Sequence, residues 1–499
     1  MYRNVLDYFE KTVAEVPEKV AFSGEHSALT FRQLYDCSKA MASALIRDGY
    51  TKEPILVFME KSPEEICTFF GIIRSGCFYV PIDEEMPAER IRLIIENCSP
   101  RAMICDKSTK EKAESFSFDG RIYDYSELII RETDEEALQS VYDAALDTDP
   151  IYIVFTSGST GVPKGVVACH RSVIDYVEQL SKVLGFNRDT VFGNQSPLYF
   201  DACLKELYPT LMFGATTHLV PRQLFMQPKA LVEYLNEKKI NTICWVVSAL
   251  TMISAFKTFD LVKPEFLHTV AFGSEVFPMK QYRIWREAVP KAAFINLYGP
   301  TEATGMSCYY RCEREFGEEE PIPIGRPFYN TQVLLLDETG APAKKGQPGE
   351  ICLRGTCVTL GYYNNPEKTG EAFVQNPLNP HYPELIYKTG DMGYYNEYGE
   401  LCFLSRKDYQ IKHMGHRIEL GEIEADAAKI EGIKICACTY QKEKDKIILH
   451  YVGDLSEKEL TKVLKDALPR YMLPARLHRM EEMCFTANGK VDRKALEKM

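Results

Sequence analysis

Apolar positions along the first half of the chain follow two different periods. Residues 31–50 and 63–76 place apolar side chains every three or four positions, which is typical of helices. Residues 54–59 and 77–83 are short continuous apolar runs, which indicate strands buried on both faces. Helix-type and strand-type segments alternate again after residue 172. Such alternation with short connections predicts parallel sheets covered by helices.

The pattern changes after about residue 320. Residues 322–337, 349–355 and 399–406 are β-type runs separated by Gly, Pro and Asn, which predict a smaller β-rich subdomain. A last unit with two helical patterns and a strand begins near residue 407. We therefore expect an α/β protein with a large N-terminal domain, 1–406, of helix-covered sheets that includes the β-rich subdomain. A small mobile α+β C-terminal domain, 407–499, follows it.

Composition and charge exclude several classes of protein. The 499 residues are 45% hydrophobic and 26% charged, as in a globular protein, with a net charge of −12. That acidic balance argues against a nucleic-acid-binding protein. Residues 407–499 carry a net +2 and the remainder −14. The sequence has no apolar run of 18 residues and no secretory signal pattern, and its 16 cysteines are scattered singly. We expect no membrane span, reduced thiols and a cytoplasmic location.

The segment with the most specific chemistry is 151–170. A buried apolar run leads into a loop rich in glycine and hydroxyl groups, with one lysine. Unobstructed backbone N–H groups, hydroxyls and an ammonium are the donors that hold a polyphosphate. The spacing differs from the Walker pattern, because a proline precedes the lysine and no Ser or Thr follows it. The candidate phosphate-binding residues are Thr156, Ser157, Gly158, Ser159, Thr160 and Lys164.

Three later segments carry further candidates. Residues 294–307 place Tyr298 before a Gly-Pro turn and Glu302, an aromatic ring that can stack on a base and a carboxylate that can hold a hard metal ion. Asp391 follows a glycine turn and Arg406 ends a β-type run. Lys490 lies on an Asn-Gly turn ahead of a short helical pattern.

In this order and spacing, the four segments resemble the adenylate-forming superfamily, which includes adenylation domains of peptide synthetases, D-alanine–carrier protein ligases, acyl-CoA synthetases and luciferases. The resemblance runs from residue 29 to residue 496, and within the superfamily the chain looks like a stand-alone amino-acid adenylation domain. It implies ATP and Mg²⁺ as cofactors. It also implies a role for each candidate in nucleotide binding: the loop closes over ATP, Tyr298 stacks on adenine, and Asp391 and Arg406 hold the ribose. Thr301 lies near the α-phosphate, and Glu302 binds Mg²⁺. The catalytic Lys490 reaches the substrate carboxylate, and Asp408 is a hinge.

The resemblance also implies where the amino acid binds. Asp201 after Phe200 matches the residue that pairs with the α-ammonium in amino-acid-activating members; from sequence alone, Asp201 could instead be a helix N-cap. The positions expected to line the pocket are Asp201, Ala202, Lys205, Trp245, Val270, Phe272, Leu297, Gly305 and Met306. Trp245, Phe272 and Met306 would fill much of a small cavity, which favours a small neutral amino acid. Lys205 favours the alternative of an acidic side chain, unless it reaches Glu206 or solvent.

The acceptor of the activated amino acid is expected to be a separate carrier protein with a phosphopantetheine thiol. An acyl-CoA synthetase that uses coenzyme A is one alternative, and Asp201 argues against it. A non-catalytic nucleotide-binding protein is the other, and the presence of Glu302, Asp391 and Lys490 argues against that.

Overall fold

The computed structural model describes residues 2–158, 162–318, 320–407, 410–485 and 491–499. Its contacts divide the chain into two compact units. The first comprises Met1–Glu84, Cys98–Val154 and Val166–Ser405, and the second Glu85–Asn97, Phe155–Gly165 and Arg406–Met499. The fold is α/β with large helix-covered sheets and a smaller C-terminal part, which confirms the fold predicted from the sequence. The second unit also takes in two stretches of the N-terminal sequence, 85–97 and 155–165.

The largest sheet of the first unit has nine strands. Pairing is parallel from β13 through β1, and β2, β14 and β15 are antiparallel to their neighbours. In spatial order the strands are β15 (Arg326–Pro327), β14 (Cys308–Arg311), β13 (Ala293–Tyr298), β12 (Thr269–Gly273), β11 (Thr242–Val246), β9 (Val191–Asn194), β10 (Thr216–Leu219), β1 (Val20–Ser23) and β2 (Ala28–Thr30).

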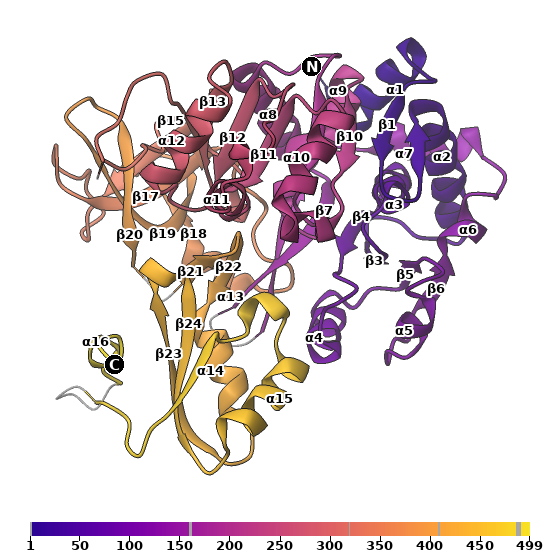
Figure 1. Ribbon diagram of the computed structural model, residues 1–499. Helices are drawn as coiled ribbons and strands as arrows, with labels where there is room; N and C mark the ends of the chain where they lie inside the picture. The colour runs from indigo at the N-terminus through magenta and orange to yellow at the C-terminus, as the bar shows by residue number, and fades with distance from the viewer. Residues whose placement is uncertain (1, 159–161, 319, 408–409, 486–490) are drawn as a thin grey trace. The chain divides into compact units, whose positions relative to one another are not determined.

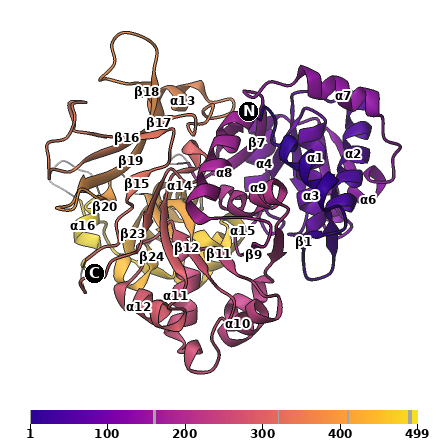
Figure 2. The ribbon, with the colours of Figure 1, turned by 90° about the horizontal axis from the view of Figure 1, so that it is seen from above.

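Helices cover both faces of this sheet and define two hydrophobic cores. Helices α8 (His170–Leu184) and α9 (Leu204–Phe213) contribute to the core that contains Ala271 and Leu297. Helices α10 (Pro228–Glu237), α11 (Val247–Ala255) and α12 (Met279–Ala288) contribute to the core that contains Trp245 and Phe272. Figure 2 shows β11 and β12 between these two groups of helices. The side chains of successive strand residues therefore enter different cores.

A six-stranded sheet is built from the N-terminal third of the chain. Its strands, in spatial order, are β6 (Arg121–Asp124), β5 (Ala102–Cys105), β3 (Pro54–Phe58), β4 (Phe78–Pro81), β7 (Pro150–Thr156) and β8 (Lys164–Cys169). The helices along this part of the chain are α1 (Leu6–Glu15), α2 (Phe31–Arg47), α3 (Pro63–Arg74), α4 (Ala88–Cys98), α5 (Lys110–Glu114), α6 (Tyr125–Leu128) and α7 (Glu135–Ala144). Local sequence sets two of their starts: Thr30 and Gln33 form a capping box on α2, and Ser62 caps α3 ahead of Pro63.

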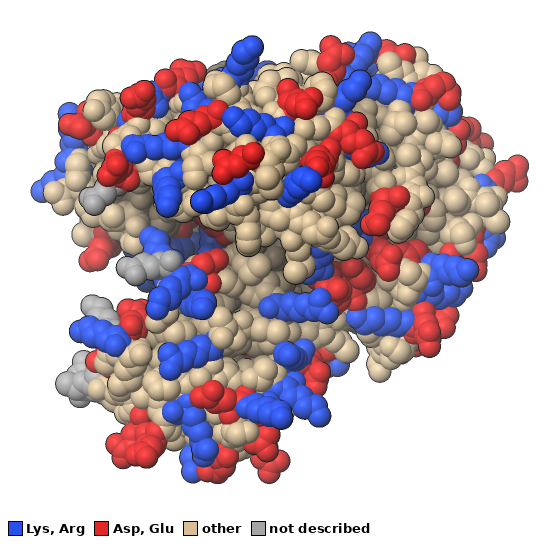
Figure 3. Space-filling view, in the orientation of Figure 1, with Lys and Arg blue, Asp and Glu red and all other residues tan. Residues whose placement is uncertain are grey.

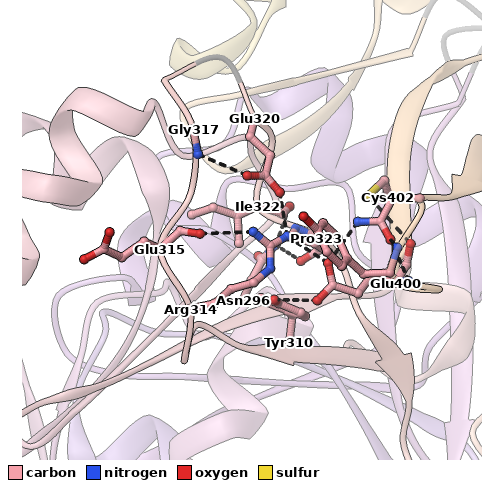
Figure 4. Close-up of polar contacts among 12 residues, drawn as sticks. Asn296, Tyr310, Arg314, Glu315, Gly317, Glu320, Ile322, Pro323, Glu400 and Cys402 are labelled. Carbon is pink, nitrogen blue, oxygen red and sulfur yellow. Dashed lines mark hydrogen bonds and ion pairs between the residues drawn. The ribbon is translucent and has the colours of Figure 1, made fainter.

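The β-rich part is a five-stranded antiparallel sheet with one helix, α13 (Pro366–Ala372). Its strands are β16 (Thr331–Leu336), β17 (Gly349–Gly355), β18 (Phe373–Gln375), β19 (Leu385–Tyr395) and β20 (Leu401–Arg406). Figure 4 shows how Arg314 joins this sheet to the nine-stranded one: its Nη2 donates to Glu320 at 2.5 Å and to Glu400, before β20, at 2.9 Å. Tyr310 on β14 donates to the same Glu400 carboxylate at 2.7 Å. These bonds fix β14 against the β19–β20 hairpin.

The C-terminal part of the second unit is α+β. It contains the hairpin β21 (Gln410–His413) and β22 (His416–Glu419), and a three-stranded sheet of β23 (Ile433–Gln441), β24 (Lys446–Gly453) and β25 (Arg476–Arg479). Its helices are α14 (Leu420–Ala428), α15 (Glu457–Ala467) and α16 (Arg493–Leu496), and Figure 1 shows these elements at the yellow end of the chain. Ile418, Ile423, Leu449 and Leu460 form its core, each fully buried.

All 16 cysteines are free thiols, as the sequence predicts for reduced cysteines. Across the described residues, every helix is too short or too polar to cross a bilayer. Lysine and arginine side chains are interspersed with aspartate and glutamate over the face that Figure 3 shows.

Candidate functional site

The predicted phosphate loop follows β7 directly. Thr156 ends β7, and its Oγ1 donates to the carbonyl oxygen of Lys164, the first residue of β8, at 3.5 Å. Gly158 fits a close backbone approach, because a Cβ there would lie 2.0 Å from the carbonyl oxygen of Val162. Gly158 and Val162 therefore lie in close backbone contact. The candidates Ser159 and Thr160 lie outside the described residues.

Within the second unit, the donors of this loop face carboxylates. The N–H of Gly158 donates to Oε2 of Glu422 at 3.2 Å, and Lys164 Nζ lies 3.9 Å from Oε1 of Glu419. Glu422 also pairs with Arg90, and both side chains are buried. Burial raises the pKa of Glu422, and Arg90 opposes that shift. The backbone N–H and the ammonium that the sequence assigns to phosphate thus already bind or approach anionic oxygens.

Ser157 makes the third loop contact of this kind. Its Oγ donates to the carbonyl oxygen of Arg417 at 2.9 Å and accepts from the N–H of Glu419 at 3.2 Å. The hydroxyl therefore holds the loop to β22 through backbone atoms.

Tyr298 and Asp391, which the sequence assigns to adenine and ribose, are brought together by the fold. Tyr298 ends β13 in the nine-stranded sheet and Asp391 lies on β19 in the five-stranded sheet. The Tyr298 hydroxyl donates to Oδ2 of Asp391 at 2.6 Å, and both residues are buried. Burial, and then the charge of Asp391, raises the pKa of Tyr298. The phenol is therefore a fixed neutral donor that orients the carboxylate.

Glu302 lies on the turn that follows β13. Gly299 begins this turn, where a Cβ would lie 2.4 Å from the carbonyl oxygen of Gly305. The Glu302 side chain is buried, and its Oε1 accepts from the Tyr362 hydroxyl at 2.8 Å. The described residues hold no cluster of three His, Cys, Asp or Glu side chains able to bind a metal by themselves. A single oriented carboxylate fits Mg²⁺, which completes its coordination with water and substrate phosphates. Thr301, half-buried, precedes Glu302.

Asp201 lies beside Gly305, at the other end of the turn that follows β13. It opens the short 3₁₀ helix Asp201–Cys203 that leads into α9 and is half-buried. A Cβ built on Gly305 would lie 3.8 Å from Oδ2 of Asp201 and 3.7 Å from the Tyr176 hydroxyl. Among the described residues the Tyr176 hydroxyl has no hydrogen-bond partner, and burial, followed by the charge of Asp201, raises its pKa. Asp201, Tyr176 and Gly305 are therefore close neighbours.

Strand register separates the expected pocket positions into two groups. Leu297 and Met306 belong to the core on the α8 and α9 face, together with Asp201's neighbour Tyr176. Trp245, Val270 and Phe272 belong to the core on the α10 to α12 face. Trp245 donates its indole N–H to the carbonyl oxygen of Gly193 at 2.6 Å and packs against Phe225.

The two groups are separated because successive side chains of a strand point to opposite faces of the sheet. Trp245 lies opposite Phe272 in the register of β11 and β12, and Cys244 lies opposite Ala271, so the two pairs occupy different faces. Cys244 and Ala271 lie in the same core as Leu297, and Gly273 pairs with Leu297. The side chains of Trp245, Val270 and Phe272 therefore lie in the core on the face opposite Leu297, whereas Cys244 and Ala271 share the core of Leu297.

Three buried polar residues, Lys205, Glu206 and Asn194, and the half-buried Lys61 lie close to the start of α9. Lys205 on α9 is 4% exposed and Glu206 is fully buried. Asn194 Nδ2 donates to Oε2 of Glu206 at 3.2 Å. Lys61 Nζ donates to the carbonyl oxygens of Asn194 and Gln195, each at 3.3 Å. Burial raises the pKa of Glu206 to about 7, while Lys205, Asn194 and Lys61 act to lower it. Burial lowers the pKa of Lys61 to about 8, while the charge of Glu206 acts to raise it.

The remaining predicted residues are distributed as follows. Ala202 is half-buried next to Asp201, and Arg406 is the last residue of β20 and belongs to the second unit. Lys490 and Asp408 lie outside the described residues.

Sequence reasoning missed Cys244, Ala271, Gly273, Tyr176 and Lys61. The first three are related to Leu297 by the register between β11, β12 and β13, which the sequence of each strand does not give by itself. In the sequence, Tyr176 occupies an ordinary apolar position of a helical pattern, and Lys61 has the pattern of a surface lysine before α3. Only the packing of distant segments shows that the last two lie beside Asp201 and Glu206.

Comparison with known proteins agrees with this arrangement. The AMP-binding enzyme family matches residues 9–363. The chain is 33% identical, over 98% of its length, to part of gramicidin S synthase 2 of Brevibacillus brevis. It is 30% identical, over 99% of its length, to part of surfactin synthase subunit 1 of Bacillus subtilis (strain 168). The chain spans only 11% and 14% of the lengths of these two relatives.

Solved structures give the same fold. Holo-PA1221, described as an NRPS protein containing adenylation and PCP domains, is 25% identical with a TM-score of 0.82, covering 99% of this chain and 84% of that one. The Vibrio cholerae adenylation domain AlmE, solved with glycyl-adenosine-5'-phosphate, is 21% identical with a TM-score of 0.85, covering 100% and 98%. The Bacillus subtilis o-succinylbenzoate CoA synthetase MenE is 20% identical with a TM-score of 0.84, covering 100% and 99%. The last two likenesses concern the fold alone.

Proposed function

Since this chain belongs to the AMP-binding enzyme family, we propose that it activates an amino acid with ATP and transfers it to the thiol of a carrier protein. One observation carries the proposal. The turn after β13 starts at Tyr298, bonded to Asp391, and reaches Gly305 beside Asp201. The residues assigned to the nucleotide and the residue assigned to the α-ammonium are thus joined by one short turn.

The reaction has two steps. A carboxylate oxygen of the amino acid bonds to the α-phosphorus of ATP, the bond from that phosphorus to the bridging oxygen breaks, and pyrophosphate leaves. A thiolate then bonds to the carbonyl carbon of the aminoacyl-adenylate, and AMP leaves with the electron pair of the broken acyl–oxygen bond. The carboxylate needs no general base, since it is ionised at neutral pH. Catalysis of the first step is therefore positioning and stabilisation of negative charge.

The nucleotide is held by groups from several elements. Thr156, Ser157, Gly158, Ser159, Thr160 and Lys164 are proposed to bind the phosphates. The Tyr298 ring is proposed to stack on adenine, and Asp391 and Arg406 to bind the ribose hydroxyls. Glu302, with Thr301 beside it, would hold Mg²⁺, which supplies positive charge to the phosphates when bound. Lys490 is proposed to reach the substrate carboxylate and the α-phosphate.

Asp201 supports an amino acid over a plain fatty acid. A half-buried carboxylate beside Gly305 and the Tyr176 hydroxyl pairs with an α-ammonium through a charge-assisted contact. A fatty acid has no ammonium group for Asp201 to bind.

The acceptor is proposed to be a phosphopantetheine thiol on a carrier protein. Support comes from PA1221, whose description names adenylation and PCP domains together. Coenzyme A is the competing acceptor, since MenE is a CoA synthetase with the same fold.

The expectation of a small neutral amino acid rested on Trp245, Phe272 and Met306 filling the pocket. Trp245 and Phe272 belong to the core on the opposite face of the sheet, whereas Met306 belongs to the core that contains Leu297. The support for a small side chain is therefore reduced to Met306.

An ATP–pyrophosphate exchange panel tests the proposal. The purified protein should exchange labelled pyrophosphate into ATP with at least one proteinogenic amino acid, of either enantiomer, and show only background exchange with fatty and aryl acids. Loaded with that amino acid, it should form a thioester on a holo carrier protein faster than on coenzyme A. Exchange supported only by fatty or aryl acids would overturn the amino-acid assignment, and faster transfer to coenzyme A would overturn the assignment of the acceptor.

A further inference from the structure

A cavity of about 300 Å³ lies in the N-terminal part of the first unit. Its walls come from the start of α1, from α2, α3 and α7, and from the first residues of β7 and α8. Figure 2 shows α1, α2, α3 and α7 grouped at the indigo end of the chain. The volume is at the lower end of the range for small-molecule sites. Its lining residues are all different from those assigned above to ATP and to the amino acid, so the proposed reaction leaves this cavity without a role.

His170 presents a hydrogen-bond donor to this cavity. The residue lines the cavity and is only 4% exposed. Its Nδ1 accepts from the N–H of Val5 at 3.2 Å, so the ring carries its proton on Nε2. Nε2 makes no hydrogen bond with any described residue, and packing does not seal it. This N–H therefore faces the open space of the cavity.

Asn4 provides a second donor close to the first, because it precedes Val5 in the chain. It also lines the cavity and is 4% exposed. Its Oδ1 accepts from the N–H of Leu6 at 3.0 Å, while its Nδ2 has no hydrogen-bond partner in the described part of the chain and is not sealed by packing. A buried N–H without an acceptor is costly, so two such donors in one cavity indicate a ligand that supplies acceptors.

The charged groups of the lining are already paired. Its three carboxylates each form an ion pair with a basic side chain: Glu10 with Arg74, Glu135 with Lys39 and Asp149 with Lys52. The side chains of Glu10 and Glu135 are 41% and 70% exposed, so water can reach their remaining lone pairs. Nε and Nη2 of Arg74, a side chain only 10% exposed, are enclosed without a hydrogen-bond partner among the described residues. The groups left unsatisfied around this cavity are therefore donors, and they need acceptors.

These walls favour one class of ligand. A carboxylate brings two acceptor oxygens and no donor, and its hydrogen bonds to N–H groups are charge-assisted. A primary amide or an ammonium brings N–H groups, which would compete with the cations that the lining carboxylates already bind. The remaining lining suits a short hydrocarbon chain, because it is apolar: Leu6, Ile73, Leu138, Val141, Ala145 and Pro150.

We propose that this cavity is a second small-molecule site, which binds a small monocarboxylate with a short apolar chain. The carboxylate accepts from Nε2 of His170 and from Nδ2 of Asn4, and the apolar chain packs against Leu138 and Val141 of α7. The site is independent of the function proposed above, since it shares no residue with it.

Isothermal titration calorimetry of the full chain with hexanoate, hexanamide and hexylamine tests this site. Hexanoate should bind with a dissociation constant on the order of 1 mM or below, and at least about tenfold more tightly than the other two. Asn4→Asp keeps an acceptor for the N–H of Leu6 and replaces the Nδ2 donor by a carboxylate oxygen. It should weaken hexanoate binding at least about tenfold, because a donor is lost and like charges meet.

Asn187→Asp is the matched control. Oδ1 of the exposed Asn187 likewise accepts from the N–H two residues on, that of Asp189, at 2.8 Å, and Asn187 lies outside the cavity lining. Hexanoate should bind this variant as it binds the unmodified chain.

The outcomes decide as follows. Absence of hexanoate binding would mean that only water enters the cavity, and it overturns the site. Hexanamide or hexylamine that binds as tightly as hexanoate overturns the carboxylate class. Hexanoate binding that Asn4→Asp leaves unchanged takes place elsewhere and overturns the assignment to this cavity. If Asn4→Asp does not fold, judged by its melting temperature, Val141→Phe enlarges a lining side chain and should abolish binding, and unchanged binding there overturns the assignment equally.

Discussion

Two buried tyrosine hydroxyls lie near the carboxylate of Asp201. Burial raises the pKa of Tyr152 and Tyr176, and the charge of Asp201 is the next contribution in both. Both phenol oxygens lack a hydrogen-bond partner within the described residues. A carboxylate with two neutral hydroxyls near it is suited to an ammonium group, which donates three hydrogen bonds.

Replacing Asp201 by alanine should weaken amino-acid binding by about 10²-fold or more, because the substrate ammonium loses its half-buried counter-charge. The KM for ATP should stay close to that of the unmodified enzyme. Pyrophosphate exchange at varied amino acid and at varied ATP measures both, with Asp189→Ala as an exposed control. Equal activity of the unmodified enzyme toward an amino acid and its des-amino analogue would disprove amino recognition.

Helices α1 and α8 are joined by a histidine that the fold keeps neutral. Nδ1 of His170, the first residue of α8, accepts from the N–H of Val5, which precedes α1, at 3.2 Å. Burial lowers the pKa of His170 to about 4, and Asp149, Asp7 and Asp147 oppose the shift. The native state therefore disfavours protonation, and α1 depends on this histidine staying uncharged.

Because the native pKa of His170 is depressed, its contribution to stability is complete above pH 6.5 and is lost as the pH falls toward 4. The difference between an ordinary value near 6.5 and about 4 corresponds to about 3 kcal/mol. His170→Asn keeps an acceptor for Val5 and should remove this part of the acid destabilisation. Urea unfolding midpoints between pH 7 and 4.5 measure it, with His381→Asn as the exposed control. An unchanged pH slope in His170→Asn would contradict this account.

At the scale of the whole chain, the two domains predicted from the sequence differ in net charge. Residues 407–499 carry a net +2 and residues 1–406 a net −14. The first half-reaction releases pyrophosphate and the second uses a thiol. The two steps need different groups beside the carboxyl group of the amino acid. Lys490, outside the described residues, is proposed to serve only the first, and Asp408 to be the hinge that moves it away.

Lys490→Ala should lower adenylate formation by about 10²–10³, the effect of losing one preorganised charge donor. Thioester formation from presynthesised aminoacyl-adenylate should be nearly unaffected. Single-turnover assays of each half-reaction measure this, with Lys498→Ala, exposed near the same end, as the control. An equal loss in both half-reactions would refute the separate roles.

The sequence by itself determined what depends on local pattern. Apolar periodicity predicted the α/β architecture, and glycine and hydroxyl spacing marked the loop after β7. Both features rest on neighbouring residues. The roles of Tyr298, Glu302, Asp391 and Asp201 were implied by the resemblance of the motifs to the adenylate-forming superfamily.

Tertiary structure alone decided which side chains meet. Tyr298 and Asp391 are 93 residues apart and bond only because two sheets adjoin. Lys61 reaches Asn194 across 133 residues, and no local pattern marks that contact. Strand register decided that Cys244 rather than Trp245 lies in the core that contains Leu297, because a shift of one residue moves a side chain to the opposite face of a sheet.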